Sequence, residues 1–185
     1  MFKVAATALT VLAAAPAFAT GLEITVAGEA NGVIEIQLRD DLAPQHVAQI
    51  VALAEEGAYD NVAFHRVIDG FMAQTGDVEF GKMDADFDIR QAGMGGSDRD
   101  NIPAEFSEES FERGVVGMAR SQNPDSANSQ FFIMFAPGEF LNGQYTIIGE
   151  VTEGMDIVDA IKLGTGPNGA VVGEPDRMVS VTVTD

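Results

Sequence analysis

The sequence predicts a mainly β protein in which eight short strands form one closed antiparallel barrel, capped by two α-helices. Two observations carry this prediction. Eight short segments have the apolar and β-branched composition of strands, and only two segments show helical spacing of apolar residues. A chain of 185 residues with neither internal repeats nor a linker has room for one domain. Closing eight strands into a barrel removes the unpaired sheet edges.

The expected strands are short and are separated by recognisable turns. They are predicted at residues 22–26, 34–38, 61–67, 71–75, 114–119, 130–135, 144–151 and 178–184. Asn31-Gly32 joins the first pair and Asp69-Gly70 joins the third and fourth strands, since such dipeptides favour tight hairpin turns. In the last strand, Val179, Val181 and Val183 alternate with polar residues, so the valines are expected to face inward.

Two helices and one long irregular segment complete the predicted architecture. Pro44 is expected to open a helix that stops at Gly57, with Asp40 and Asp41 at the positive end of the helix dipole. A second, shorter helix is predicted at residues 155–162. Between residues 78 and 110 acids and glycines dominate and periodicity is lost, which indicates a long surface loop. Long ordered loops are often functional, so the tip of this one is expected to reach a ligand.

Residues 1–19 have the features of a secretory signal peptide. Lys3 gives the start a positive charge, Val4–Pro16 is apolar, and Ala17-Phe18-Ala19 is a small-x-small cleavage signal. The alternative, a first core strand or helix, is disfavoured because no acid or turn residue interrupts the run before Ala17. We therefore expect cleavage after Ala19, export across the inner membrane to the periplasm, and a mature domain at 20–185.

The charge of the mature chain limits its partners. The leader holds one of the ten basic residues and none of the 29 acidic ones, so residues 20–185 carry a net charge of −20. A surface this acidic repels nucleic acid and anionic lipid, and no nucleic-acid or membrane partner is expected. The same repulsion favours a monomer. The absence of cysteine excludes disulfides and a lipoprotein anchor, so packing alone must stabilise the fold.

One predicted hairpin, Phe64–Asp77, combines apolar residues with two polar side chains, those of Arg66 and Gln74. Alternation along the strands puts Arg66 on one face with Phe64 and Ile68, and puts Gln74 on one face with Met72. An apolar surface with a few polar groups is typical of small binding sites. An ordinary hairpin whose arginine reaches solvent explains the stretch equally well, so the hairpin alone leaves both interpretations open.

Other familiar site patterns fail on their spacing, and no metal or other cofactor is expected. The acidic run that begins at Asp84 resembles an EF-hand loop, but Ile89 and Gly95 stand where glycine and glutamate are required. His46 has no second histidine at ligand spacing. A hydrolase with His65 as its base stays an alternative without a recognisable motif, because no Gly-x-Ser-x-Gly turn is present.

Four stretches together resemble the cyclophilin family of peptidyl-prolyl cis-trans isomerases. They are Phe64-His65-Arg66-Val67-Ile68 with Gly70-Phe71-Met72, Gln74 and Gly76-Asp77; Gly117-Met118-Ala119-Arg120; Asn128-Ser129-Gln130-Phe131-Phe132-Ile133; and Phe140-Leu141-Asn142-Gly143-Gln144-Tyr145 with Gly149. They occur in the family's order, and the similarity extends over 22–184. The resemblance implies a cyclophilin-like barrel and catalysis of rotation about X-Pro bonds in unfolded or partly folded client chains.

The resemblance also assigns roles to individual residues. Arg66 matches the catalytic arginine, and Gln74 matches the glutamine that bonds the substrate backbone. The residues that match the proline pocket are Phe71, Met72, Phe132 and Leu141. His65 matches a histidine that lines the same surface. The positions that run along the peptide and support that wall are Ala119, Arg120 and Gln130.

Three positions depart from the pattern of many eukaryotic members. Phe140 stands in place of tryptophan and Tyr145 in place of histidine, as in bacterial-type members, and Phe140 puts cyclosporin sensitivity in doubt. Arg120 replaces the common asparagine, and its charge could favour acidic neighbours of the substrate proline. The alternative to an isomerase is a binding module, in which a cyclophilin fold holds client chains with little turnover.

Overall fold

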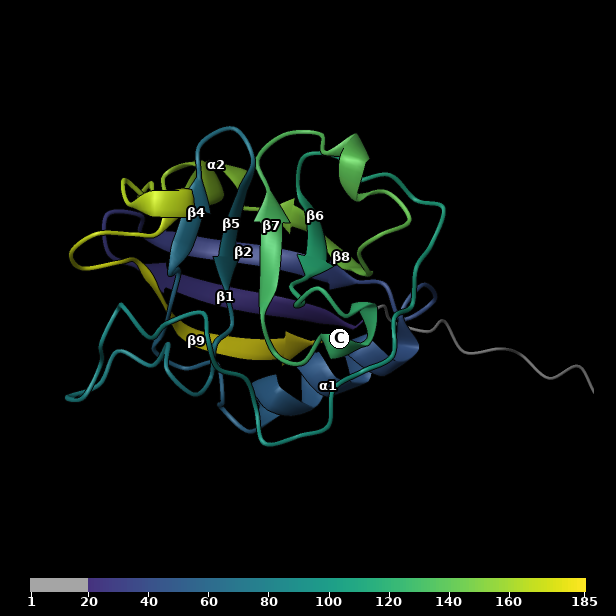
Figure 1. Cartoon of the computed structure of the whole chain (residues 1–185), viewed down its shortest axis with the longest axis horizontal. Coiled ribbons are helices and arrows are strands. Elements are labelled where there is room, and N and C mark those ends of the chain that lie inside the picture. The colour runs from purple at the N-terminus through teal and green to yellow at the C-terminus, as the bar shows by residue number, and fades with distance from the viewer. Residues whose placement is uncertain (1–19) are drawn as a thin grey trace, which may run out of the picture.

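The computed structural model describes residues 20–185 and contains nine strands, two α-helices and three short 3-10 helices in this part of the chain (Figure 1). The predicted signal peptide lies outside the described residues. The elements are β1 (Gly21–Ala27), β2 (Gly32–Leu38), α1 (Pro44–Glu55), β3 (Val62–Ala63), β4 (Arg66–Ile68), β5 (Met72–Thr75), β6 (Val115–Met118), η1 (Pro124–Ser126), β7 (Phe131–Met134), η2 (Glu139–Leu141), β8 (Ile147–Glu153), α2 (Met155–Asp159), η3 (Pro167–Gly169) and β9 (Arg177–Thr184).

The strands form one curled antiparallel sheet in the order β3-β9-β1-β2-β8-β6-β7-β5-β4. The prediction of a closed eight-stranded barrel is therefore wrong: the ladder is an open half-barrel of nine strands, with β3 and β4 at its two edges. The extra strand arises because the expected strand 61–67 is interrupted at Phe64 and His65. The Phe64 amide donates to the Asp176 carbonyl (2.8 Å), and the Val171 amide donates to the His65 carbonyl (3.0 Å). These two residues pair with the C-terminal segment instead of a neighbouring strand.

The helices lie at opposite ends of the curled sheet, with α1 in contact with β9 and α2 in contact with β2 (Figure 1). Side chains of both helices belong to one hydrophobic cluster. Pro44 opens α1 and Gly57, at φ +66°, follows its end, as predicted. The carboxylate at the start of α1 comes from Glu105 and not, as predicted, from Asp40 or Asp41. Asp41 bonds to Arg39, and the carboxylate of Glu105 accepts the amides that begin α1. The second helix ends at Asp159, three residues earlier than predicted.

Strand β7 is buried on both faces and separates two hydrophobic clusters. Phe131 and Ile133 belong to the larger cluster, which joins β1, β2, β9 and α1. Phe132 and Met134 belong to a smaller cluster that joins β5, β6, β7, β8 and η2. Because side chains alternate along a strand, this one element contributes to both. The smaller cluster forms the floor of the site described below.

The expected long loop is present: between β5 and β6 the structure has no helix or strand, apart from single bridges at Lys82 and Ile102. It is tied to the sheet by polar side chains instead. Asp77 is buried at the start of the loop, and Asn128 accepts the Ser97 amide (2.7 Å) and donates to the Arg99 carbonyl (3.0 Å). The loop thereby returns to the strand face that carries Gln74 and Gln130.

Candidate functional site

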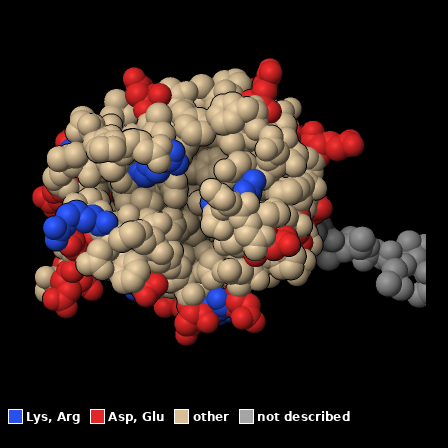
Figure 2. Space-filling model, viewed as in Figure 1, with Lys and Arg blue, Asp and Glu red and all other residues tan. Residues whose placement is uncertain are grey.

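Two adjoining cavities open on one face of the sheet, which is visibly hollowed (Figure 2). The first, of about 240 Å³, is called here the strand cavity and is lined by Arg66, Phe71, Met72, Gln74, Ala119, Arg120, Phe132, Phe140, Leu141 and Tyr145. The second, of about 280 Å³, is called the loop cavity and is lined by Gln74, Gly93, Met94, Gly95, Ala119, Arg120, Ser121, Ser126, Asn128, Ser129 and Gln130. Gln74, Ala119 and Arg120 form the boundary between them.

Strand register explains how distant residues meet in the strand cavity. Arg66 of β4 lies opposite Gln74 of β5, and Gln74 lies opposite Phe132 of β7. Directly opposite residues in an antiparallel pair point to the same face. A row of three side chains from three strands therefore runs from a charged group through an amide to an aromatic ring.

The floor of the strand cavity is also part of the smaller hydrophobic cluster. Met72, Phe132 and Leu141 are buried, and the Phe132 ring stacks on Phe111 with centroids 5.8 Å apart. Gly117 makes this stacking possible, because a β-carbon there would lie 2.6 Å from atoms of both rings. The floor is consequently rigid and apolar.

The rim of the strand cavity is aromatic and more open. Phe140 is 65% exposed and packs against Phe71 with ring centroids 5.4 Å apart. On another side Tyr145 meets Phe132 edge-on at 5.9 Å. These rings surround the opening of the strand cavity.

Arg66 is held by neutral acceptors. Its Nε and Nη2 atoms donate to the backbone carbonyl (2.9 Å) and the side-chain Oδ1 (3.1 Å) of Asn168, and its Nη1 donates to Gln74 Oε1 (3.0 Å). Partial burial lowers the pKa of Arg66 below its ordinary value, and the nearby Tyr145 acts in the opposite direction. A guanidinium still remains charged at neutral pH and has five N–H donors. Two of them, one on each Nη atom, are left for a ligand.

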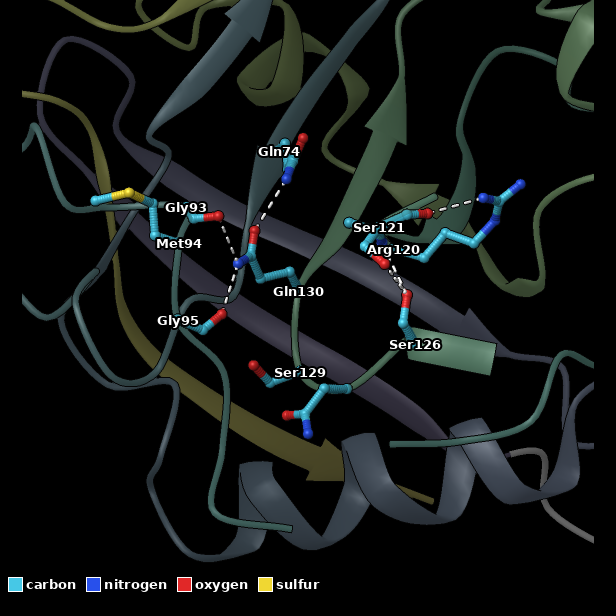
Figure 3. Close-up of a pocket in the computed structure, with 11 residues that line it drawn as sticks. Gln74, Gly93, Met94, Gly95, Arg120, Ser121, Ser126, Ser129 and Gln130 are labelled. Atoms are coloured by element: carbon cyan, nitrogen blue, oxygen red, sulfur yellow. Dashed lines mark hydrogen bonds between the residues drawn. The ribbon is translucent and has the colours of Figure 1, made fainter. Parts of the chain in front are cut away.

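The glutamines connect Arg66 to the wall of the loop cavity, and Figure 3 shows this chain of bonds from Gln74 onward. Gln74 Nε2 donates to Gln130 Oε1 (2.9 Å), and Gln130 Nε2 donates to the carbonyls of Gly93 (3.1 Å) and Gly95 (2.8 Å). Gln130 thus holds the segment at Gly93-Met94-Gly95 beside the strand face. The tip of the long loop therefore lines a cavity, and its contact with a ligand stays a prediction.

The same loop segment is anchored from below by Asp77. Its Oδ1 accepts the amides of Glu79 and Phe80, and its Oδ2 accepts the amides of Gly93 (2.7 Å) and Gly95 (3.0 Å). A fully buried carboxylate with four backbone donors is well satisfied. Asp77 therefore determines where the wall of the loop cavity stands, without lining it.

His65 is the one predicted site residue that lines neither cavity. It is only 5% exposed and lies directly beneath Gly93, where a β-carbon would come within 2.7 Å of its ring. Burial lowers the pKa of His65 to about 4, against the opposing effect of Asp77. The expectation that His65 lines the binding surface is therefore corrected: it supports the loop segment from inside.

All other predicted site residues line one or both cavities, and two important residues were missed. Asn168 holds Arg66 from η3, and Asp77 holds the loop wall. Asp77 stood within the hairpin stretch without a role, and Asn168 gave only the turn signal of Pro167-Asn168-Gly169. Nothing in the spacing of these two residues indicated which side chain they would contact.

No cluster of metal-ligating side chains is found among the described residues. Among residues 20–185, no three His, Cys, Asp or Glu side chains gather in a way that could hold a metal ion. In the same part of the chain, no helix has the length and apolar character needed to cross a membrane. The chemistry available at the strand cavity is hydrogen bonding from a guanidinium and an amide beside an apolar floor.

Comparison with known sequences gives consistent matches over almost the whole described chain. A family model described as cyclophilin type peptidyl-prolyl cis-trans isomerase/CLD matches residues 22–183. A protein of Brucella suis biovar 1 (strain 1330) named "Probable peptidyl-prolyl cis-trans isomerase" is 61% identical over 153 residues, which cover 83% of this chain and 78% of that protein. Peptidyl-prolyl cis-trans isomerase B of Escherichia coli (strain K12) is 38% identical over 168 residues, covering 84% and 96%.

Solved structures match the fold as well. Cyclophilin AquaCyp293 from Hirschia baltica superimposes with a TM-score of 0.69 and 26% identity, over 88% of this chain and 73% of that one. A cyclophilin-type isomerase from Cryptosporidium parvum, crystallised in the presence of the dipeptide Ala-Pro, has a TM-score of 0.73 and 24% identity, over 89% and 99%. The second likeness concerns the fold alone.

Proposed function

The chain belongs to the cyclophilin-type peptidyl-prolyl cis-trans isomerases, and from this premise we propose that it turns X-Pro bonds of exported, unfolded or partly folded proteins at the strand cavity. The observation that carries the choice of site is the pairing of Arg66 with an apolar floor. The guanidinium retains two N–H donors beside Met72, Phe132 and Leu141. The substrate would place its proline ring in this cavity.

Rotation about an X-Pro bond is slow because the amide has partial double-bond character, with a barrier of about 18–20 kcal/mol. At the top of the barrier the amide is twisted, its resonance is lost and its nitrogen carries a lone pair. Arg66 can donate to that lone pair or to the prolyl carbonyl, and either contact favours the twisted amide over the planar one. The rigid planar fork of arginine, fixed by Asn168 and Gln74, suits this role.

The magnitude of this contact requires help from the cavity. A hydrogen bond to a charged group contributes about 1.5–3 kcal/mol net, which corresponds to roughly ten- to a hundredfold in rate. The apolar floor would exclude water and strengthen the electrostatic interaction, while Gln74 would hold the backbone on one side of the bond as the other side turns. No covalent intermediate or proton transfer is needed in this scheme.

The test is an isomerisation assay on a short X-Pro peptide, followed by NMR exchange so that no coupling protease is needed. We expect wild type to accelerate exchange and Arg66→Ala to lower kcat/KM by about ten- to a hundredfold. Arg90→Ala is the control, because Arg90 is exposed in the long loop and bonds only to Asp88. Equal rates for wild type and Arg66→Ala would remove Arg66 from the mechanism.

Export is a separate part of the proposal and rests on the sequence of residues 1–19, with their basic start, apolar run and Ala17-Phe18-Ala19. Expression of the full chain in a bacterium with an outer membrane, followed by fractionation and mass spectrometry, tests it. The expected product is periplasmic and begins at Thr20. A full-length product confined to the cytoplasm would contradict export while leaving the isomerase assay unaffected.

A further inference from the structure

The basic side chains of this acidic protein fall into two groups. In residues 20–185 there are nine lysines and arginines. Five of them form ion pairs with carboxylates: Arg39, Arg90, Arg99, Arg113 and Lys162. Among the four described residues that form none are Arg66 and Arg120, the two that line the cavities. With 29 acids in the chain, carboxylate partners are abundant, yet Arg66 and Arg120 bond only to uncharged groups.

Arg120 is fixed in place entirely by uncharged groups. Its Nε (3.1 Å) and Nη2 (2.8 Å) donate to the backbone carbonyl of Gln144, and its Nη1 (2.9 Å) donates to the carbonyl of Ser121, the bond drawn in Figure 3. The guanidinium carbon lies 4.3 Å from the centre of the Tyr145 ring. The side chain is thus oriented while its full charge remains uncompensated, and two of its five N–H donors stay available.

Arg66 and Arg120 both line the strand cavity, and no acidic side chain lines it. Neither cavity has an aspartate or glutamate in its lining, and Arg120 belongs to both linings. Figure 2 shows Lys and Arg side chains on both sides of the hollow, with most Asp and Glu side chains nearer the outline of this face. The cavities are a local positive site on a chain whose described part has a net charge of −20.

We infer that this site selects X-Pro segments with a carboxylate side chain next to the proline, and that Arg120 is the residue that reads it. The inference rests on the proposed placement of the proline ring in the strand cavity. A residue next to that proline would then lie near Tyr145, and the Arg120 guanidinium is held over this ring, on the side away from the loop cavity in Figure 3. A carboxylate arriving there displaces no existing ion pair, so the new charge-assisted hydrogen bonds are gained without an equal loss.

The overall negative charge opposes this preference only weakly at contact distance. Repulsion between solvent-exposed charges is screened over about 8 Å at physiological ionic strength. A carboxylate at hydrogen-bond distance from Arg120 experiences the guanidinium much more strongly than the distant acids. Long-range repulsion acts on every acidic peptide regardless of its contacts, so a variant of equal net charge controls for it.

The experiment compares two series of short proline peptides. In one series Glu, Gln or Lys directly precedes the proline, and in the other they stand one residue earlier. We measure kcat/KM by NMR exchange and Kd by chemical-shift titration for wild type, Arg120→Gln and Arg90→Gln. Arg90→Gln changes the net charge by the same amount and lies outside both linings.

In wild type we expect the Glu peptide to exceed its Gln counterpart by about three- to tenfold in at least one series, with Lys lowest. The Glu/Gln ratio should fall to about one in Arg120→Gln and stay at the wild-type value in Arg90→Gln. Arg120→Glu should reverse the order and favour Lys. Thermal unfolding of each variant identifies any that fail to fold. The Glu/Gln ratio of wild type tests the preference for a carboxylate even if a variant does not fold.

Equal values for Glu and Gln in both series of wild type would overturn the inference, as would a ratio that survives in Arg120→Gln. The two measurements separate it from the proposed function. If Kd favours Glu but no peptide is turned over, the catalytic scheme fails and the acid preference stands. If all peptides are turned over equally and bind equally, the preference fails and the catalytic scheme stands.

Discussion

The strand cavity and the loop cavity share Gln74, Ala119 and Arg120, but different forces hold their remaining walls. The strand cavity rests on β4, β5 and β7 and on buried apolar side chains that also form a hydrophobic cluster. The wall of the loop cavity at Gly93-Met94-Gly95 is held by hydrogen bonds to two side chains, Asp77 and Gln130. The first cavity therefore inherits the rigidity of the sheet, and the second depends on a few polar contacts that can be removed one at a time.

The largest expected effect concerns the apolar floor. Phe132→Ala should lower the free energy of unfolding by about 3–5 kcal/mol, since the ring is buried and stacked on Phe111. Phe140→Ala is the matched control: it also removes a ring from the strand cavity, but one that is 65% exposed, and should cost far less. Urea unfolding measures both. Similar losses in the two variants would mean that the floor is not part of the core.

The next effect concerns the anchor of the loop cavity. Asp77→Ala should destabilise the fold by about 2–4 kcal/mol, because four backbone amides lose their acceptor. Hydrogen exchange should accelerate at Gly93 and Gly95 before it does so in β5 or β7. Asp84→Ala is the control, since Asp84 is an exposed loop carboxylate that accepts only the Asp86 amide. Uniform acceleration across the sheet would contradict a separately held loop wall.

The third effect is a pH dependence of the free energy of unfolding, caused by His65, which lies beneath the loop wall. The pKa of His65 is lowered by burial from 6.5 to about 4, so the unfolded chain binds this proton at a higher pH than the folded chain does. Stability should therefore be lost as pH falls from about 6.5 to about 4, by roughly 3 kcal/mol from this group. Above pH 6.5 the contribution is constant.

His65→Gln provides the comparison for that window. Unfolding is measured between pH 4 and pH 8, and the values near pH 8 give the packing cost of the substitution alone. The variant should lose less stability than wild type between pH 6.5 and pH 4. Parallel curves for the two proteins would show that His65 titrates alike in the folded and unfolded chains.

The contrast between the strand cavity and the loop cavity also explains what the sequence could predict. Seven of the eight predicted strands each match one strand of the structure, and the eighth, at 61–67, overlaps both β3 and β4. Alternating apolar residues made this possible, because they determine which face of a strand is buried. Alternation placed Gln74 with Met72 and placed Arg66 with Phe64 and Ile68. The family resemblance supplied Phe132 and Leu141 from distant segments. The residues that line the strand cavity were therefore named from the sequence, while their roles in binding stay predictions.

The predictions that failed concern contacts between distant segments, and no local sequence pattern encodes such contacts. The strand expected at 61–67 breaks because Phe64 and His65 bond to the C-terminal segment, and the ladder consequently stays open between β3 and β4. The alternation expected in β9 is also disturbed, since its pairing with β1 shifts register at Thr25. Asp77 and Asn168 act on residues far away in the chain, so their roles emerged only from the folded structure.

The smallest expected effect concerns Arg66, the proposed catalytic group, which is held by Asn168 of the η3 segment and by Gln74 of β5. Asn168→Gly removes the side-chain oxygen that accepts from Arg66 Nη2, while glycine tolerates the left-handed backbone there (φ +56°). We expect kcat/KM to fall by about three- to tenfold, with kcat more affected than KM, because the guanidinium loses one of three restraints. Asn61→Gly, at the other described non-glycine position with positive φ, is the control and should leave turnover unchanged.

A double-mutant cycle decides whether Asn168 acts through Arg66 or through the fold. In an Arg66→Ala background, the guanidinium that Asn168 positions is already gone, so Asn168→Gly should have almost no further effect on kcat/KM. A purely structural role would lower activity by the same factor in both backgrounds. That additive result would mean that β4 and β5 alone orient Arg66, and that the hydrogen bond to the Asn168 side chain does not contribute to its orientation.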